Sequence, residues 1–172
     1  FTSAGRYSDT VYTNEGDDTI TPGLGNYDRV YAGENAGDSD LLILDYSVGD
    51  DATTGGVSMY VYGSNYDYSI GEYLSSSGYV YRYTIAGNSL DYLSFQDVER
   101  FNVTGTSKDD VLEGWQEDDI LIGGAGNDTI DAGNGGIDYL DGGEGTDLLK
   151  NADLSTVTGD LTIEVGTSND IT

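Results

Sequence analysis

The chain has 172 residues, a length that suits one medium domain or two small ones. It contains 32 acidic residues and only 6 basic ones, and the resulting net charge of −26 disfavours binding to nucleic acids and to anionic lipid surfaces. It has no Cys and no His, which excludes disulfides, cysteine nucleophiles and any catalytic arrangement that needs histidine. No apolar run approaches the ~20 residues of a transmembrane helix.

The composition favours strands and turns over helices. Asp accounts for 24 of the acidic residues and Gly for 26 of all residues, and both types favour turns. A hydrophobic content of 37% with 15 Tyr is too high for a disordered, solvating segment. We therefore expect an all-β fold.

The first predicted element is a repeat block at residues 1–42. Each copy is a loop followed by Asp, one variable residue and an aliphatic residue, as in Asp18-Thr19-Ile20. The block is degenerate, because Tyr7 and Asp38 stand at a loop position where the more regular copies have Gly or Asn. The Asp residues, spaced by 9, 10 and 12, are Asp9, Asp18, Asp28 and Asp40.

Residues 43–104 interrupt the repeat and carry 10 of the 15 Tyr. Alternation of apolar and polar residues predicts strands near 57–62, 66–70 and 79–85. We expect a small antiparallel β insert between the two repeat blocks. Its tyrosines favour either a role in the core of the insert or contacts with sugars or another partner.

A second, more regular repeat block is predicted at residues 105–150. Its clearest copy is Gly123-Gly124-Ala125-Gly126-Asn127-Asp128-Thr129-Ile130-Asp131. Two of its loops depart from the pattern, at Lys108 and Glu117. The Asp residues, spaced by 9, 9, 10 and 9, are Asp110, Asp119, Asp128, Asp138 and Asp147. Residues 151–172 are predicted to be a strand linker that leads into a further repeat block, because 166–170 repeat the pattern of 105–110.

The two blocks resemble the RTX family, whose hemolysin-type nonapeptide reads G-G-x-G-x-D-x-U-x, with U a large aliphatic residue. The resemblance implies a right-handed parallel β-roll in which two nonapeptides make one turn. Asp residues about 18 apart would then stack: Asp110, Asp128 and Asp147 on one edge, and Asp119 and Asp138 on the other. In the first block, Asp9 would stack with Asp28, and Asp18 with Asp40.

Stacked carboxylates repel one another unless a cation lies between them. Calcium suits such a site, because it accepts 6–8 oxygen ligands that mix carboxylates with backbone carbonyls. The resemblance implies several calcium ions, each shared between adjacent turns. The implied ligands are Asp119, Asp128, Asp138, Asp147, Asp110, Asp18, Asp28, Asp9 and Asp40, with carbonyls near Gly123, Gly124, Gly126, Gly133, Gly136, Gly142, Gly143 and Gly145.

The resemblance implies a calcium-binding structural module of a large secreted or cell-surface repeat protein, such as an adhesin, surface-layer or matrix component. Such proteins are typically exported unfolded by type I secretion and fold on calcium outside the cell. One alternative is a module that binds glycans or a protein partner, or self-associates, through the Tyr-rich insert. Another is the non-catalytic repeat region of a secreted RTX enzyme or toxin. We expect the chain itself not to be an enzyme, since no residue set with catalytic spacing occurs.

Overall fold

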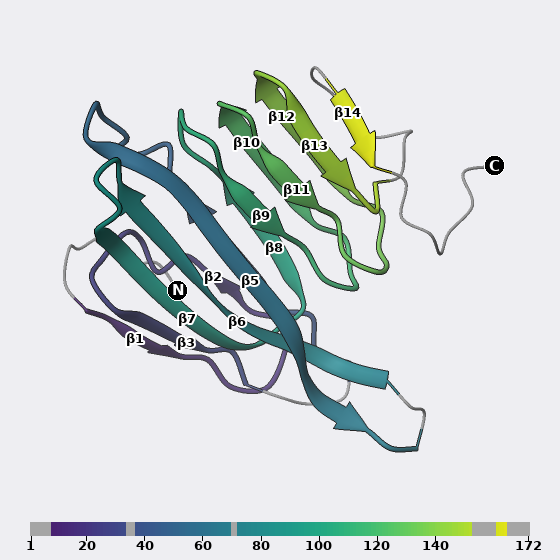
Figure 1. Cartoon of the computed structure of the whole chain (residues 1–172). Coiled ribbons are helices and arrows are strands. Elements are labelled where there is room, and N and C mark those ends of the chain that lie inside the picture. Colours follow the sequence, from purple (N-terminus) through teal and green to yellow (C-terminus); the bar gives the residue numbers. More distant parts are fainter. Residues whose placement is uncertain (1–7, 34–36, 70–71, 153–160, 165–172) are drawn as a thin grey trace.

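The computed structural model describes residues 8–33, 37–69, 72–152 and 161–164, and every regular element in these ranges is a β-strand (Figure 1). In spatial order, the nine-stranded sheet consists of β1 (Thr10–Tyr12), β3 (Asp28–Tyr31), β7 (Ser89–Val98), β6 (Glu72–Thr84), β5 (Thr54–Asp67), β9 (Val111–Glu113), β11 (Thr129–Asp131), β13 (Asp147–Lys150) and β14 (Leu161–Glu164). The five-stranded sheet consists of β12 (Tyr139–Glu144), β10 (Ile120–Ala125), β8 (Arg100–Thr104), β4 (Leu41–Asp45) and β2 (Thr19–Ile20). The described ranges contain no helix that is long and apolar enough to span a membrane.

Successive repeat copies alternate between the two sheets. The copy ending at Ile20 supplies β2 to the five-stranded sheet, and the next copy supplies β3 to the nine-stranded sheet. Each repeat strand pairs in parallel with the strand two copies further on, as β11 does with β13 and β10 with β12. Two copies therefore make one turn of a two-layered stack, which is the arrangement expected of a β-roll.

The aliphatic residue of each repeat copy builds the core between the two layers. All nine of these side chains are at most 2% exposed. Strand register places them directly above one another, as for Leu112, Ile130 and Leu149 in one sheet and Leu121 and Leu140 in the other. A single apolar residue per nonapeptide is enough to build a core, because stacking aligns these residues in two rows, one in each sheet. The nine are Val11, Ile20, Val30, Leu42, Leu112, Leu121, Ile130, Leu140 and Leu149.

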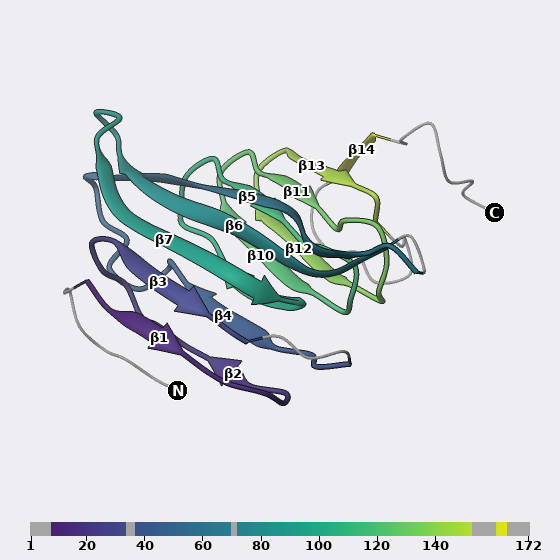
Figure 2. The ribbon, with the colours of Figure 1, turned by 90° about the horizontal axis from the view of Figure 1, so that it is seen from below.

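The Tyr-rich segment lies within the stack. Strands β5, β6 and β7 form an antiparallel meander in the middle of the nine-stranded sheet. On its two sides, β7 pairs in parallel with β3, and β5 with β9. In the opposite sheet β4 pairs directly with β8. Three long strands thus stand where the repeat would place one, and β5 and β6 extend beyond the short repeat strands (Figures 1 and 2).

The predicted strand near 66–70 is wrong. Tyr66 lies at the end of β5, which runs from Thr54 to Asp67, and Tyr68 follows it in a turn. Continued pairing of β5 with β6, as far as Tyr66 opposite Tyr73, extends the strand past the predicted boundary. Ile70 lies outside the described residues, as does the further repeat predicted at 166–170. The predicted division of the chain at residues 42, 104 and 150 stays a prediction.

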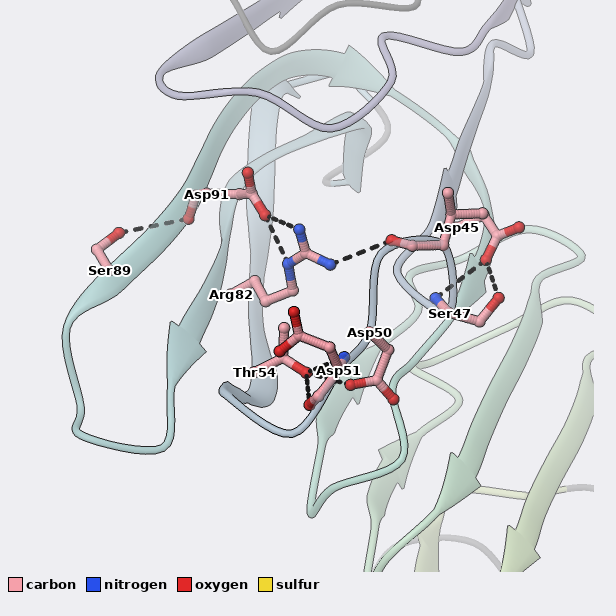
Figure 3. A network of polar contacts seen from close by, with 9 residues as sticks. Asp45, Ser47, Asp50, Asp51, Thr54, Arg82, Ser89 and Asp91 are labelled. Carbon is pink, nitrogen blue, oxygen red and sulfur yellow. Dashed lines mark hydrogen bonds and ion pairs between the residues drawn. The ribbon is translucent and has the colours of Figure 1, made fainter.

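A buried ion pair fastens the meander to the loop after β4 (Figure 3). The Arg82 guanidinium contacts Asp91 Oδ2 at 2.5 Å, and the two side chains are only 6% and 12% exposed. Arg82 Nη1 also donates to the backbone carbonyl of Val48, and the guanidinium lies over the ring of buried Tyr46. The pair therefore connects β6, β7 and the 46–49 loop.

Candidate metal centre

The repeat Asp residues form hydrogen-bonded ladders along both edges of the stack. In each ladder, Oδ1 of one Asp accepts a hydrogen bond from the backbone N–H of the Asp one turn earlier, at 2.7 to 2.9 Å. The five linked pairs are the ones expected from the spacing: Asp9 with Asp28, Asp18 with Asp40, Asp110 with Asp128, Asp128 with Asp147, and Asp119 with Asp138. The stacking prediction is confirmed.

Most of these carboxylates are out of contact with solvent. Seven of the nine are at most 5% exposed: Asp28, Asp40, Asp110, Asp119, Asp128, Asp138 and Asp147. The other two, Asp9 and Asp18, are partly exposed because they belong to the first turn of the described stack and have no described turn before them. A buried carboxylate needs a compensating partner, since the ionised form loses its hydration on burial.

Glycines leave room beside their Cα atoms for oxygen atoms of two successive turns. A Cβ atom on Gly123 would lie 2.2 Å from Asp128 Oδ2 and 2.8 Å from the carbonyl oxygen of Gly142. Those two oxygens, a carboxylate of one turn and a carbonyl of the following turn, therefore occupy the space that a side chain would fill. Oxygens of both kinds are ligands that calcium accepts together.

Four of the five loops of the second block fall into two kinds, which differ in what the second carboxylate oxygen contacts. In loops 105–110 and 114–119, Oδ2 of the Asp accepts a backbone N–H from the residue four positions earlier, Thr106 at 2.6 Å or Trp115 at 2.7 Å. In loops 123–128 and 142–147, Oδ2 of Asp128 and of Asp147 is buried and has no hydrogen-bond partner among the described residues. The first kind satisfies its carboxylate internally, whereas the second requires a further partner.

A glycine distinguishes the second kind of loop. The residue four positions before the Asp is Gly124 or Gly143, with φ of 113° and 83°. A side chain disfavours this backbone conformation. In it, the N–H of the glycine does not donate to the carboxylate, whereas the N–H groups of Thr106 and Trp115 do. The two unsatisfied carboxylates thus follow the two loops that match the nonapeptide best. Asp40 Oδ2, in the first block, is also buried and lacks a partner within the described ranges.

Burial shifts the proton equilibria of these groups. Desolvation raises the pKa of Asp119 and Asp128 to about 7, and that of Asp110 and Asp40 to about 6. Hydrogen bonds from backbone N–H groups oppose this effect, and the neighbouring Asp of the ladder adds to it. Without a cation, the ladders hold carboxylates that ionise reluctantly near neutral pH.

No three acidic side chains among the described residues come together in a group that could hold a metal ion. The carboxylates are instead distributed along each edge, about one for each turn. Any cation between turns would need backbone carbonyls to complete its coordination. The predicted carbonyl donors lie in the same loops as the carboxylates, at Gly123, Gly124, Gly126, Gly133, Gly136, Gly142, Gly143 and Gly145.

A second, opposite ladder was not predicted from the sequence. The residue just before the repeat Asp accepts a backbone N–H from the following turn, as Asp109 does from Asn127 and Asp118 from Ile137, both at 2.7 Å. Asp17 and Asn127 do the same with Ser39 and Thr146. These side chains stabilise the stacked loops, which explains why many repeats carry a second acidic residue or an Asn beside the first.

Glu99 is a ladder residue that the sequence interpretation missed. Its Oε2 accepts the backbone N–H of Asp40 at 2.8 Å, as the Asp of a following turn would, and it is 6% exposed. Glu99-Arg100-Phe101 repeats the pattern Asp-x-aliphatic with a longer acid and an aromatic residue. That similarity was the available signal. Glu99 therefore continues the ladder across the short link between β7 and β8.

Comparison with known families agrees with this geometry. A family model described as RTX calcium-binding nonapeptide repeat (4 copies) matches residues 3–27, 102–130 and 132–150. These segments are RTX repeats. The RTX match includes the ladder residues of the second block, whereas Asp28, Asp40 and Glu99 lie outside it. No curated protein matches the chain. The RTX repeats identify the chain as carrying a calcium-binding repeat module.

Proposed function

We propose that this chain is a calcium-binding structural module that folds outside the cell as part of a large secreted or cell-surface repeat protein. The observation that carries the proposal is the pair of buried oxygens, Asp128 Oδ2 and Asp147 Oδ2, that lack a partner among the described residues. A divalent cation would be the missing partner of each of these two carboxylate oxygens. The proposal assigns the module no catalytic reaction.

In this proposal, Asp128 and Asp147 hold calcium with the loop carbonyls near Gly123 and Gly142. The remaining predicted ligands, Asp119, Asp138 and Asp110 in the second block and Asp9, Asp18, Asp28 and Asp40 in the first, serve further ions. Calcium fits better than magnesium, because calcium accepts carboxylates together with backbone carbonyls in flexible geometry, while magnesium demands octahedral geometry and retains its water.

The charge of the chain supplies the driving force for a folding switch. At a net charge of −26 the metal-free chain repels itself, and the stack brings its carboxylates still closer together. Calcium removes that repulsion, so its binding free energy becomes folding free energy. Extracellular modules bind calcium with dissociation constants of about 10⁻⁴ to 10⁻³ M, which would keep this chain unfolded in a low-calcium cytoplasm. We propose that the folded form is a right-handed roll of two calcium-loaded blocks joined by the Tyr-rich strands.

The test is far-UV circular dichroism during a calcium titration, with reversal by EDTA and magnesium as the control cation. We expect a cooperative transition from coil to β-structure near millimolar calcium that magnesium does not produce. A chain that keeps its full β spectrum in EDTA would contradict the folding switch.

The Tyr-rich strands favour a second role, in binding a partner. Tyr60 and Tyr62 are each 48% exposed, although the alternate residues Val57 and Met59 of the same strand are buried. Aromatic side chains that face solvent in a cluster are typical of interaction surfaces.

A further inference from the structure

The outer face of the meander carries a continuous cluster of aromatic rings, which we call the tyrosine face. Its members come from three neighbouring strands and contact one another with ring centroids 5.0 to 6.5 Å apart. The tyrosine face consists of Tyr60 and Tyr62 on β5, Tyr79, Tyr81 and Tyr83 on β6, and Tyr92 on β7.

Strand register explains why these rings share one face. Tyr60 lies opposite Tyr79, and Tyr81 lies opposite Tyr92, in adjacent rows of the sheet. The alternate residues of the same strands point the other way, and Val80 there is fully buried. The rings therefore cover the solvent side of the sheet, on strands that run side by side in Figure 1.

The tyrosine face has no charge of its own. Within β5, β6 and β7 the other residues of its rows are neutral: Ser58, Ser77, Ser94 and Gln96. One charge of each sign lies at its borders, Arg29 of β3 beside Ser94 and Glu113 of β9, which accepts the Val61 N–H. Tyr is uncharged at neutral pH, and desolvation raises the pKa of Tyr62, Tyr81 and Tyr83 further. The face is thus a neutral aromatic area on a strongly acidic chain.

The net charge disfavours several partners that such a face could bind. A nucleic acid or an anionic polysaccharide would be repelled by the net charge of −26, and a second copy of the chain would be repelled in the same way. A neutral polymer meets no such barrier. Sugar rings have apolar C–H faces and hydroxyl edges, which match the apolar ring and the hydroxyl of Tyr.

We propose that the tyrosine face binds a neutral polysaccharide by stacking sugar rings on Tyr60, Tyr79 and their neighbours. This proposal deepens the second role given above and needs the folded module, but it does not depend on which residues bind calcium. An extended sheet surface suits a polymer that lies along it.

The experiment is a pull-down of the whole chain, in calcium, on microcrystalline cellulose and on galactomannan-coated beads, with alginate beads as the anionic control. We expect binding to a neutral polysaccharide and none to alginate. The double variant Tyr60→Ser/Tyr79→Ser should bind about tenfold more weakly or worse, since two stacking rings are lost. The variant Tyr79→Phe should keep most of the binding, because it retains the ring.

The matched control is Tyr66→Ser. Tyr66 is 41% exposed on the same strand, but its ring contacts Tyr68 and Tyr73 instead of the tyrosine face. Circular dichroism in calcium reports whether each variant is folded, which separates loss of the surface from failure of the calcium-dependent fold. Wild-type chain that is folded yet binds neither neutral polysaccharide overturns the proposal. The proposal is also overturned if Tyr66→Ser weakens polysaccharide binding as much as Tyr60→Ser/Tyr79→Ser does. A wild-type dimer in sedimentation that Tyr60→Ser/Tyr79→Ser abolishes would overturn it as well.

Discussion

Asp147 Oδ1 accepts a hydrogen bond from the backbone N–H of Asp128 at 2.9 Å, while Asp147 Oδ2, equally buried, meets no hydrogen-bond partner in the described part of the chain. The two oxygens of one carboxylate thus have different roles. The first oxygen fixes the distance between successive turns, and the second is left for a ligand. This division separates the structural part of the ladder from the part that we propose binds a cation.

Asp147→Asn tests the division directly. The amide keeps an oxygen that can accept the Asp128 N–H, but it removes the negative charge. We expect the calcium midpoint for folding to rise roughly tenfold or more, because affinity follows the number of charged ligands. The measurement is a calcium titration followed by circular dichroism. Asp45→Asn is the control, since the exposed Asp45 carboxylate contacts only Ser47 in the described bonds, and its midpoint should not move.

Gly143→Ala tests the close approach of the stacked loops. An added Cβ would lie 1.9 Å from the carbonyl oxygen of Gly124, and φ at Gly143 is 83°. Gly87→Ala is matched to it, because φ there is 79° and an added Cβ would meet no described atom within 4 Å. In saturating calcium we expect losses in the free energy of unfolding of roughly 3 kcal/mol for Gly143→Ala and about 1 kcal/mol for Gly87→Ala. Equal losses of unfolding free energy in the two variants would contradict this expectation, because they would show that the backbone relieves the clash between the loops.

The pH dependence should have opposite signs with and without calcium. Desolvation raises the pKa of Asp119 and Asp128 to about 7 in the fold, above the value of about 3.9 in an unfolded chain. In EDTA, stability from these groups is therefore present below about pH 4 and is lost as the pH rises through about 7. With calcium, only ionised carboxylates bind the ion, so the calcium midpoint should rise as the pH falls from about 8 to about 6. The measurements are far-UV circular dichroism of the chain in EDTA, whose β-structure should increase toward acid pH, and the calcium midpoint at each pH. A metal-free form that gains stability on the alkaline side would refute the argument.

Arg82→Met tests whether the buried ion pair holds the meander in place. The substitution leaves the Asp91 carboxylate, 12% exposed, without its cation. We expect a loss of about 3 kcal/mol in the free energy of unfolding, since an uncompensated buried charge is costly. Asp91→Asn added to Arg82→Met should recover most of that loss. If the single and double variants unfold alike in denaturant titrations, the pair contributes by packing and not by charge.

The repeat spacing, together with the resemblance to RTX repeats, predicted the regular part of this fold. Asp residues about 18 apart share an edge, and aliphatic residues two positions later share the core, because a stack with two copies per turn brings every second copy into register. Each of the five predicted Asp pairs and all nine aliphatic residues follow this rule. Such regularity is visible in a sequence since each repeat contacts only its neighbours.

Only the tertiary structure decided what happens where the repeat stops. The pairing of β7 with β3 and of β5 with β9 joins segments more than 50 residues apart, and no local pattern specifies it. The place of Glu99 depends on another long-range pairing, that of β8 with β4, because its carboxylate reaches Asp40 only when these two strands lie side by side. The difference between Asp119 and Asp128 likewise depends on whether a nearby backbone N–H turns toward the carboxylate, which is a matter of torsion angles and not of spacing. Spacing determines which residues become neighbours, whereas the hydrogen bonds left unmade, and with them the need for a ligand, are determined by the folded backbone.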